Sequence, residues 1–323
     1  MKDKFSRNIN YLRLSITDRC NLRCRYCMPH GIELVDMNEL LTYEEITEIV
    51  KAAVTCGITR LKITGGEPLI RRGAAGLIRA LKDLPGVEQV TMTTNGTLLG
   101  GHVHELKQSG LDAVNISLDT LRPERFEAIT GFDLLGIVRQ SIDAAISAGL
   151  QTKINVVLLD GINSDEWDDL LCLAKNCPVY VRFIELMPIS EGKNFQPVSN
   201  SRLLAAISEK YHHLEADSRS HGNGPAKYFN LPGFLGGVGF ISALCGNFCG
   251  TCNRLRLTSR GKLKPCLCYS DAVDLRQIVR KGGNKHEDLI SAIRQAVSMK
   301  PQGHCFGDAE KVSESQRMAE IGG

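Results

Sequence analysis

Short apolar segments alternate with amphipathic stretches along residues 1–190 of the chain. Clusters of β-branched and other apolar residues predict strands, which lie at residues 11–16, 60–64, 89–94, 113–118, 152–158 and 179–186. Between them, apolar residues recur at helical spacing, over residues 42–57, 74–83, 136–148 and 164–175. Such an alternation favours a parallel sheet. The predicted fold class is α/β, with the elements ordered as in a partial, TIM-like (βα)6 barrel.

Polar and sulfur-containing residues directly follow the predicted strands. In a parallel barrel, ligands bind at the C-terminal ends of the strands. The positions found there are Cys20, Cys24 and Cys27, the segment Gly65-Gly66-Glu67-Pro68, the segment Thr93-Thr94-Asn95-Gly96, Ser117 and Met187. We expect all of them on one rim of the barrel.

The chain changes character after Pro188. Residues 190–232 are of mixed polarity and carry His212, His213 and His221, which we interpret as surface histidines. Glycines accumulate over residues 233–239, and a second cysteine-rich region follows. We therefore divide the chain into a core barrel with its extension, residues 1–232, and a C-terminal cluster-binding region, residues 233–323.

Composition excludes several classes of protein. A formal net charge of +3 over 323 residues is too small to indicate a nucleic-acid partner. The chain has no apolar run of about 18 residues and no charged-then-apolar leader, so we expect neither a membrane span nor secretion. Its 12 cysteines stand in tight groups, which is typical of metal binding in a reducing compartment rather than of a disulfide framework. The expected location is the cytoplasm.

The first cysteine group, Cys20, Cys24 and Cys27, has C-x3-C-x2-C spacing. Structural zinc and closed iron-sulfur cubanes both take four protein ligands, so three thiolates predict a [4Fe-4S] cluster with one iron open to a reactant. A zinc knuckle or a chance grouping of cysteines is the alternative. One βα unit later, Gly65 and Gly66 end a strand, and their lack of side chains allows a close approach of the backbone to a ligand.

The second region contains Cys245, Cys249, Cys252, Cys266 and Cys268. We predict a second cluster here. A zinc ribbon built from Cys249, Cys252, Cys266 and Cys268 remains the alternative, because its spacing also suits four zinc ligands.

The first triplet, taken together with Gly-Gly-Glu-Pro, resembles the signature of the radical S-adenosylmethionine (SAM) enzymes. The resemblance implies that the open iron binds the amino and carboxylate groups of SAM. An electron from the cluster then splits SAM, and the resulting 5′-deoxyadenosyl radical removes a hydrogen atom from the substrate. It further implies that Gly65, Gly66 and Glu67 hold the ammonium group of SAM.

A longer set of matches is similar to the GTP 3′,8-cyclases of molybdenum cofactor biosynthesis. The matching segments are residues 12–20, residues 182–188, the pattern Cys249-x2-Cys252-x13-Cys266 with residues 253–258, and the ending Ile321-Gly322-Gly323. The resemblance implies two [4Fe-4S] clusters, SAM as cofactor and GTP as substrate. The implied reaction removes the ribose C3′ hydrogen, joins C3′ to guanine C8 and gives (8S)-3′,8-cyclo-7,8-dihydroguanosine 5′-triphosphate.

The same resemblance implies roles for individual residues. The SAM cluster would be held by Cys20, Cys24 and Cys27, and the substrate cluster by Cys249, Cys252 and Cys266. SAM contacts would come from Tyr26, Gly65, Gly66, Glu67, Ser117 and Met187. GTP contacts would come from Arg13, Lys62, Thr93, Lys153, Arg182, Arg254, Leu255 and Arg256. Cations suit a triphosphate because they form charge-assisted hydrogen bonds, and Arg254 and Arg256 would share one face of an extended segment.

The implied catalytic set is Arg254, Arg256, Gly322 and Gly323. A double glycine would ordinarily be a frayed terminus. In the family this end inserts into the active site, which is physically reasonable because a tail without side chains can enter a narrow pocket.

The chain departs from the family pattern at three places. Arg60-Leu61-Lys62 replaces the usual Lys-x-Arg, which keeps the charge at position 62 but removes a bidentate fork. Cys245 and Cys268 are additional cysteines, which we interpret as spectators because cysteine is common in protein interiors. If either completed the second cluster, no iron there would remain open for substrate.

Partners follow from the same resemblance. We expect a flavodoxin or ferredoxin as reductant and a cyclic pyranopterin monophosphate synthase as the next enzyme, and a homodimer is kept open. Two alternative functions remain, namely a peptide-modifying radical SAM enzyme with an auxiliary cluster and a non-catalytic iron-sulfur or zinc protein.

Overall fold

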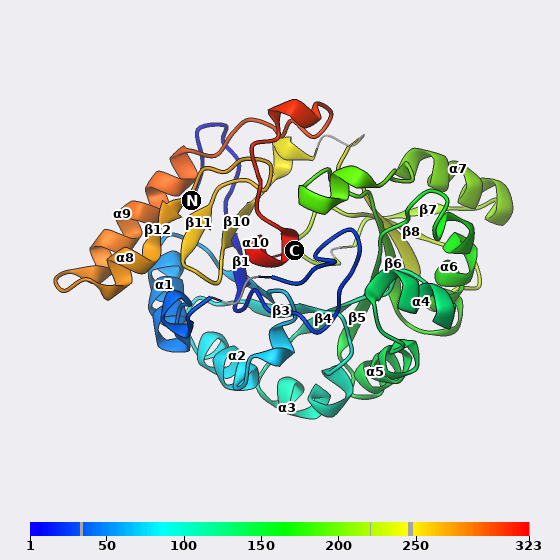
Figure 1. Ribbon diagram of the computed structural model, residues 1–323, viewed down its shortest axis with the longest axis horizontal. Coiled ribbons are helices and arrows are strands. Elements are labelled where there is room, and N and C mark those ends of the chain that lie inside the picture. The colour runs from blue at the N-terminus through cyan, green and yellow to red at the C-terminus, as the bar shows by residue number, and fades with distance from the viewer. Residues whose placement is uncertain (33–34, 220, 245–247, 323) are drawn as a thin grey trace.

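A curved sheet of 12 strands forms the frame of the molecule (Figure 1). The structure is a computed structural model that describes residues 1–32, 35–219, 221–244 and 248–322. The strands follow the order β12-β11-β10-β1-β2-β3-β4-β5-β6-β9-β8-β7. Neighbours from β10 through β1 to β9 pair in parallel, whereas the pairs toward β12 and β7 are antiparallel. This confirms the α/β barrel predicted from the alternating pattern.

The elements have the following bounds. The strands are β1 Tyr11–Ser15, β2 Arg60–Thr64, β3 Gln89–Thr94, β4 Ala113–Ser117, β5 Gln151–Val156, β6 Tyr180–Ile184, β7 Glu215–Asp217, β8 Lys227–Asn230, β9 Gly237–Ile241, β10 Arg254–Leu257, β11 Lys262–Lys264 and β12 Val273–Asp274. The α-helices are α1 Tyr43–Thr55, α2 Ala74–Lys82, α3 Val103–Gln108, α4 Pro123–Thr130, α5 Leu135–Ser147, α6 Trp167–Asn176, α7 Asn200–Tyr211, α8 Leu275–Arg280, α9 Lys285–Ser298 and α10 Met318–Ile321.

Local signals placed the predicted helices well. Thr42 and Glu45 form a capping box at the start of α1, where the Thr42 hydroxyl accepts from the Glu45 N–H at 3.2 Å. Gly57 follows that helix with a φ of 88°, a left-handed conformation that glycine adopts without a steric penalty. The helix predicted over residues 164–175 begins instead with a 3-10 turn, Ser164–Glu166, before α6.

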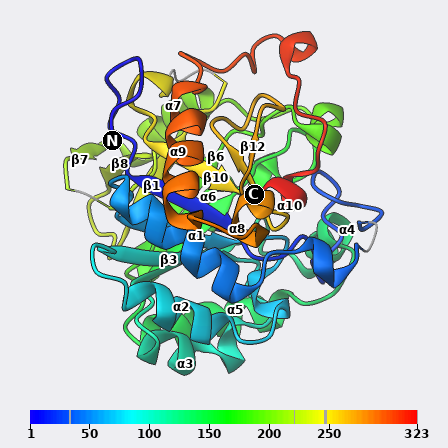
Figure 2. The same cartoon turned by 90° about the vertical axis from the view of Figure 1, so that its left-hand side faces the viewer.

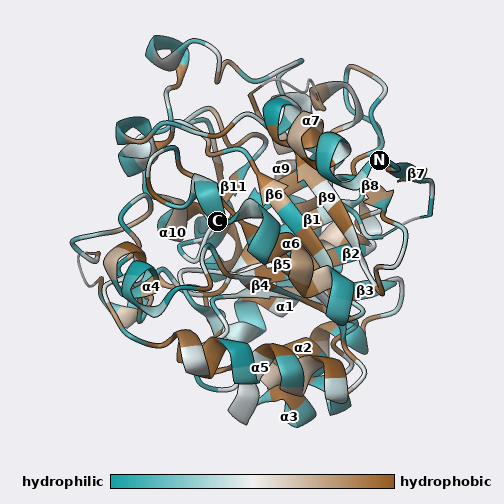
Figure 3. Cartoon of the chain, turned by 90° about the vertical axis from the view of Figure 1, so that its right-hand side faces the viewer, coloured by the Kyte–Doolittle hydropathy of each residue, from teal (hydrophilic) through white to brown (hydrophobic). Residues whose placement is uncertain are grey.

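The strands alternate between an apolar outer face and a polar inner face. In β1, Leu12 and Leu14 are buried in the core between sheet and helices, whereas Arg13 lies in the cavity enclosed by the barrel. The same alternation recurs in β2, where Leu61 and Ile63 lie in the core and Lys62 lies in the cavity. Figure 3 shows brown along the strands and mixed faces on the covering helices. The barrel therefore has a polar interior, which a run of apolar strands alone would not have predicted.

Helices cover the outer face of the sheet. In Figure 1, the helices α1, α2, α3, α5, α4 and α6 lie in this order around the outside of the strands β1 to β6. Figure 2 shows α9 beside α1, so that the C-terminal helices continue this layer over β11 and β12. None of the described helices is long and apolar enough to cross a bilayer.

The C-terminal part of the chain contributes to both edges of the sheet. Strand β9 joins β6 at one side, and β10 joins β1 at the other. The sheet thus continues across the predicted boundary between residues 232 and 233. A second apolar cluster, formed by Ile189, Leu267, Cys268, Phe306, Val312 and Ile321, holds the final segment against this part of the chain.

Candidate active site

A cavity of about 300 Å³ runs through the barrel. At the C-terminal ends of the strands it is lined by Cys20, Cys24, Cys27, Tyr26, Gly65, Gly66, Thr93, Ser117 and Met187. The expectation of one shared rim is therefore confirmed for these residues, whereas Glu67, Pro68 and Gly96, which were also expected there, are not part of the lining. The cavity also extends past the strands to Tyr11, Gln89 and Ala113 at their N-terminal ends, which the sequence analysis did not predict.

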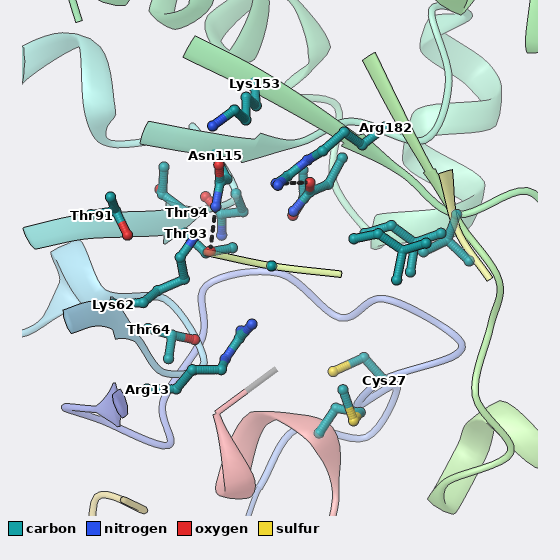
Figure 4. Close-up of a pocket in the computed structure, with 18 of the residues that line it drawn as sticks. Arg13, Cys27, Lys62, Thr64, Thr91, Thr93, Thr94, Asn115, Lys153 and Arg182 are labelled. Atoms are coloured by element: carbon teal, nitrogen blue, oxygen red, sulfur yellow. Dashed lines mark hydrogen bonds between the residues drawn. The ribbon is translucent and has the colours of Figure 1, made fainter. Parts of the chain in front are cut away.

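Buried cations form a layer in the middle of this cavity. The lining includes Arg13, Lys62, Lys153, Arg182, Arg254 and Arg256. Strand register brings Arg13 directly opposite Lys62 on one side and opposite Arg256 on the other. Figure 4 shows Arg13, Lys62, Lys153 and Arg182 directed into the same space. Like charges at opposed positions repel one another, so this layer favours an anionic ligand.

Burial makes the repulsion costly. Lys62 is 9% exposed and Lys153 is 4% exposed. Burial and the charges of Arg182, Arg13 and Lys153 hold the pKa of Lys62 well below its usual value. Burial, with Arg182, lowers the pKa of Lys153 to about 8. Neither lysine has a carboxylate partner among the described ion pairs, whereas an anion in the cavity would restore their charged state.

The carboxylates in the lining are already engaged in holding the walls together. Asp119 accepts from the Tyr26 hydroxyl at 2.6 Å and from the Val157 N–H at 2.8 Å, and burial raises its pKa to about 6. Glu185 accepts from the Asn200 N–H at 2.9 Å and from the Leu244 N–H at 2.8 Å. The two carboxylates therefore hold the loops of the cavity wall in place and do not neutralise the cation layer, which can bind an anionic ligand.

Arg182 is tied to the neighbouring strand. One guanidinium nitrogen, Nη2, donates to the Asn155 side-chain oxygen, as drawn in Figure 4. Its Nε atom is buried and has no hydrogen-bond partner within the described part of the chain. A phosphate oxygen is the kind of acceptor that such a donor requires.

The first cysteine group lies on the loop after β1. Burial raises the pKa of Cys24 strongly, with Cys27, Asp119 and Cys20 adding to the effect, and it raises the pKa of Cys27 to about 12. Neighbouring thiolates in a buried, apolar site repel one another, so their charged form is stable only beside a positive group. The iron ions of an iron-sulfur cluster provide this positive charge. The donor set therefore fits the cluster that the C-x3-C-x2-C spacing predicts.

Gly65 and Gly66 hold this loop at the end of β2. A side-chain carbon at Gly66 would lie 2.3 Å from the Arg19 carbonyl oxygen, and one at Gly65 would lie 2.5 Å from that of Thr17. The Gly66 N–H donates to Thr17 O at 2.8 Å. Both glycines are thus required for close packing against the cysteine loop. This role is separate from the close approach of a ligand that the sequence predicts.

Glu67 is not among the lining residues. Its carboxylate is fully buried and accepts from the Thr94 hydroxyl at 2.8 Å, the Asn95 N–H at 2.7 Å and the Leu69 N–H at 3.1 Å. Burial raises its pKa to about 7 against these hydrogen bonds. The side chain consequently joins the ends of β2 and β3. Leu255 likewise lies in the apolar core, on the face of β10 opposite Arg254 and Arg256.

The second cysteine group stands beside the cavity rather than in its described lining. Cys249 starts a 3-10 turn, Cys249–Thr251, and Cys252 follows this turn, two residues before the start of β10. Burial raises the pKa of Cys252, but the charges of Arg254 and Lys300 and hydrogen bonds from Arg254 outweigh it and lower the pKa to about 6. Arg254 therefore connects this group to the cation layer.

The zinc alternatives can be compared with this geometry. No group of three or more histidine, cysteine, aspartate or glutamate side chains converges on a single-ion position among the residues described. A zinc ribbon needs four ligands around one ion, whereas cysteines of a cubane each bind a different iron. Cys268 turns its sulfur toward Cys305, at an Sγ–Sγ distance of 3.0 Å, and Cys245 lies outside the described residues.

The C-terminal tail reaches the cavity. Met318 and Ala319 of α10 are lining residues, and Figure 4 shows α10 beside Cys27. Gly322 has a φ of 77° and presents its carbonyl oxygen to Arg256 Nη1 at 2.7 Å. Gly323 lies outside the described residues.

One prediction from the sequence is wrong. His221 was interpreted as a surface residue, but it is 8% exposed and lines the cavity, because a buried hydrogen bond to Asp217 draws it inward. His212 and His213 are exposed, as predicted.

Sequence reasoning also missed residues that support the second cysteine group. Lys300 Nζ donates to the Arg254 and Pro265 carbonyl oxygens at 2.8 and 2.7 Å. Arg7 Nη1 donates to the Cys249 carbonyl oxygen at 2.8 Å, although it lies far away in sequence. No local motif marks either residue, since both act through main-chain atoms.

Family models match most of the chain. One described as the Radical SAM superfamily matches residues 14–174, and one described as Molybdenum Cofactor Synthesis C matches residues 179–306. Among curated relatives, the GTP 3′,8-cyclase of Heliobacterium modesticaldum is 47% identical over 100% of both chains. Those of Clostridium perfringens strain 13 and Moorella thermoacetica are each 44% identical, again over 100% of both chains.

Solved structures agree on the fold. Streptococcus suis SuiB bound to S-adenosylmethionine has a TM-score of 0.61 at 15% identity, covering 97% of this chain and 77% of SuiB. The structure of anSMEcpe with bound AdoMet has a TM-score of 0.55 at 14% identity, covering 88% and 80%. At this identity the likeness concerns the fold alone.

Proposed function

The chain belongs to the family of GTP 3′,8-cyclases within the radical SAM superfamily, and from this premise we propose that it converts GTP to (8S)-3′,8-cyclo-7,8-dihydroguanosine 5′-triphosphate. One observation carries the assignment to this cavity. The buried lysines Lys62 and Lys153, which have no carboxylate partner among the described ion pairs, line the same cavity as the first cysteine group and Arg254. A nucleoside triphosphate has the charge that these lysines need.

We assign the triphosphate to the centre of the barrel. Arg13, Lys62, Lys153 and Arg182 are its proposed ligands, and Thr93 lies among them. The arginines can bind phosphate oxygens bidentately, whereas the lysines act as compact charges. Lys62 therefore has the same charge as the arginine that is usual at this position in the family, but it cannot bind phosphate bidentately.

SAM is assigned to the rim. Tyr26, Gly65, Gly66, Ser117 and Met187 line the cavity beside Cys20, Cys24 and Cys27. A cluster held by these cysteines would supply the electron for the reductive cleavage of SAM, and so the hydrogen-abstracting chemistry that the proposed reaction needs at C3′ of GTP. The protein's part is positioning. Asp119 fixes Tyr26 by a 2.6 Å hydrogen bond, and Glu67 fixes the rim between β2 and β3.

The guanine end is assigned to the side of the second cysteine group. Cys249, Cys252 and Cys266 are the proposed cluster ligands, and Arg254, Arg256 and the Gly322-Gly323 tail form the catalytic set. The Arg256 contact to Gly322 supports this grouping, because it brings the tail to β10. Leu255 contributes through the core in which its side chain lies.

The remaining expectations are part of the same proposal. A flavodoxin or ferredoxin would supply electrons, and a cyclic pyranopterin monophosphate synthase would use the product as its substrate. A homodimer is a further expectation for the assembled protein. Residues 1–232 would act as the barrel and residues 233–323 as the cluster-binding region. All described cysteines are free thiols, which suits the cytoplasm.

An anaerobic turnover tests this function. Protein reconstituted with iron and sulfide receives dithionite, SAM and GTP, and mass spectrometry follows 5′-deoxyadenosine and GTP-derived products. Deoxyadenosine together with a cyclised GTP isomer is expected. Deoxyadenosine with intact GTP would point to the peptide-modifying alternative, and neither product despite intact clusters would point to a non-catalytic protein.

A further inference from the structure

The turn after β7 enters the end of the cavity opposite the cysteines. Residues 221–225, here called the floor turn, all belong to the cavity lining. The Asn223 side-chain amide donates to the side-chain oxygen of Gln89, the first residue of β3, at 2.5 Å. Two glycines in this turn, Gly222 and Gly224, allow its backbone to approach the cavity closely. The floor turn therefore closes the barrel at the N-terminal ends of its strands.

His221 fixes the floor turn to the sheet. Its Nε2 atom and Asp217 Oδ2 are 2.7 Å apart, and the two side chains are only 7% and 2% exposed. The imidazole packs against the rings of Tyr180 and Tyr228, with centroid distances of 4.2 and 4.6 Å, and the two tyrosine rings contact each other edge to face at 5.3 Å. Asp217 also accepts from the Tyr180 hydroxyl at 3.2 Å. A buried imidazole that is hydrogen-bonded to a carboxylate and packed against two contacting aromatic rings is held in one orientation.

Strand β9 provides the room for this arrangement. A side-chain carbon at Gly237 would lie 2.8 Å from Tyr180, and one at Gly239 would lie 2.8 Å from Tyr228. The glycine-rich run that precedes the second cysteine region thus has a structural role. It accommodates the rings of Tyr180 and Tyr228, which both contact His221.

His221 in turn holds a cation of the cavity. Its main-chain carbonyl oxygen accepts a hydrogen bond from Lys153 Nζ. A side-chain carbon on the adjacent Gly222 would lie 3.3 Å from the same Nζ atom. Within the described residues no second acceptor contacts Nζ, so the ammonium keeps donors for a ligand. The floor turn therefore sets where this charge stands.

We propose that Asp217 and His221 are positioning residues for Lys153, and that the floor turn selects the triphosphate of the nucleotide over the diphosphate. The inference rests on the proposed function and deepens it. The floor turn and the Lys153 ammonium are both held in place. Together they define how long a phosphate chain can be accommodated between the rim and the N-terminal end of the barrel. A shorter chain would leave Lys153 without an anion, and a displaced Lys153 would no longer distinguish the two chains.

Four variants separate positioning from a general structural role. His221→Ala removes the hydrogen bond to Asp217, whereas His221→Gln keeps a side-chain donor for it. Gly222→Ala leaves the His221–Asp217 pair intact, but its new carbon meets Lys153 and its φ of 138° is unfavourable for alanine. His213→Ala, at an exposed position nearby, is the matched control.

The readout is the affinity of the cluster-loaded, full-length protein for GTP and for GDP, measured anaerobically by calorimetry, with KM and kcat beside it. For His221→Ala and Gly222→Ala we expect GTP affinity to fall about tenfold, with KM rising more than kcat falls and GDP affinity little changed. His221→Gln should restore most of the preference, and His213→Ala should match the wild type. Equal losses for GTP and GDP, or no loss in either variant, would overturn the positioning role while wild-type cyclisation still stands. Failure of the wild type to cyclise GTP would instead reject the proposed function itself.

Discussion

Arg256 donates a hydrogen bond from Nη1 to the main-chain carbonyl oxygen of Gly322 at 2.7 Å, which joins β10 to the C-terminal tail inside the barrel. Arg256 is 7% exposed, and burial together with the charges of Arg13 and Arg254 holds the pKa of its guanidinium well below the usual value. The carbonyl oxygen of Gly322 is a neutral hydrogen-bond acceptor for this buried guanidinium. The tail therefore stabilises the part of the cation layer closest to the second cysteine group.

Shortening the tail should stop cyclisation without loss of the clusters. Deleting Gly322 and Gly323 removes the acceptor of Arg256, whereas the cysteines stay in place. We expect a loss of cyclised product of about a hundredfold or more, since one misplaced catalytic donor has this effect. Product is measured by mass spectrometry, and iron and sulfide content by chemical analysis. Full turnover of the truncated protein would contradict the role of the tail.

A point substitution gives a finer test of the same contact. Gly322→Ala places a carbon 3.1 Å from Ser15 Cβ and 3.3 Å from Thr64 Cγ2. Gly161→Ala is its control, because Gly161 also has a positive φ, 70°, but a carbon there meets nothing within 4 Å. Only the first variant should lose activity.

Removing one buried cation should raise stability and lower affinity together. Lys62→Met keeps most of the side-chain volume and takes away a charge that faces Arg13, Lys153 and Arg182. Without nucleotide, we expect the free energy of unfolding to rise by about 1 kcal/mol or more, because a buried charge without a partner is costly. GTP affinity should fall about tenfold.

Urea denaturation measures the first effect and calorimetry the second. Lys175→Met on the exposed surface of α6 is the control, and it should change neither. A Lys62→Met protein that was less stable and bound GTP normally would exclude a phosphate site at this layer.

GTP binding should weaken as the pH rises through about 8. Burial, with Arg182, lowers the pKa of Lys153 to about 8 in the free protein. Below that pH the ammonium is charged and attracts phosphate, and above it the neutral amine does not. Affinity is therefore fully present near pH 7 and should fall up to about tenfold between about pH 7 and about pH 9. Calorimetric titrations over this range should show a flatter profile for Lys153→Met.

The additional cysteines should not be needed for the clusters. Cys268 Sγ faces Cys305 Sγ at 3.0 Å, in an apolar cluster with Ile189 and Phe306. Cys268→Ser and Cys245→Ser should keep the iron and sulfide content of the wild type, whereas Cys266→Ser should lose about half of it. Iron loss in either of the first two variants would make that cysteine a ligand of the second cluster.

Glu67 should contribute stability through three donors. Glu67→Gln turns an acceptor-only group into one that carries a donor, beside the Thr94 hydroxyl and the Asn95 and Leu69 N–H groups. Because a buried donor left without an acceptor costs about 1–3 kcal/mol, we expect the free energy of unfolding to fall by about 2 kcal/mol. Urea denaturation compares it with Glu209→Gln on the exposed face of α7. Equal stability of the two variants would mean that Glu67 is not needed to hold the rim.

Local patterns predicted most of the rim. Each predicted strand of the core was found within two residues of its bounds, and the helix predicted from residue 42 begins at the capping box of Thr42 and Glu45. These signals act within a few residues of each other, so one segment of sequence contains them completely. The cysteine spacing and the Gly65-Gly66 turn are of the same kind. Because all core strands are parallel, residues that follow them had to meet on one side.

Tertiary structure alone decided the interior of the barrel. Register between β10, β1 and β2 placed Arg256, Arg13 and Lys62 side by side, although β10 lies far along the chain. The inward turn of His221 depends on Asp217 and on two tyrosines from different strands, and no local pattern shows that the glycines of β9 leave space for their rings. The sequence by itself thus determined the elements, the cluster motif and the family. The cation layer, the floor turn and the Arg256–Gly322 contact arise only when distant strands pair, because long-range hydrogen bonding and packing choose which residues become neighbours.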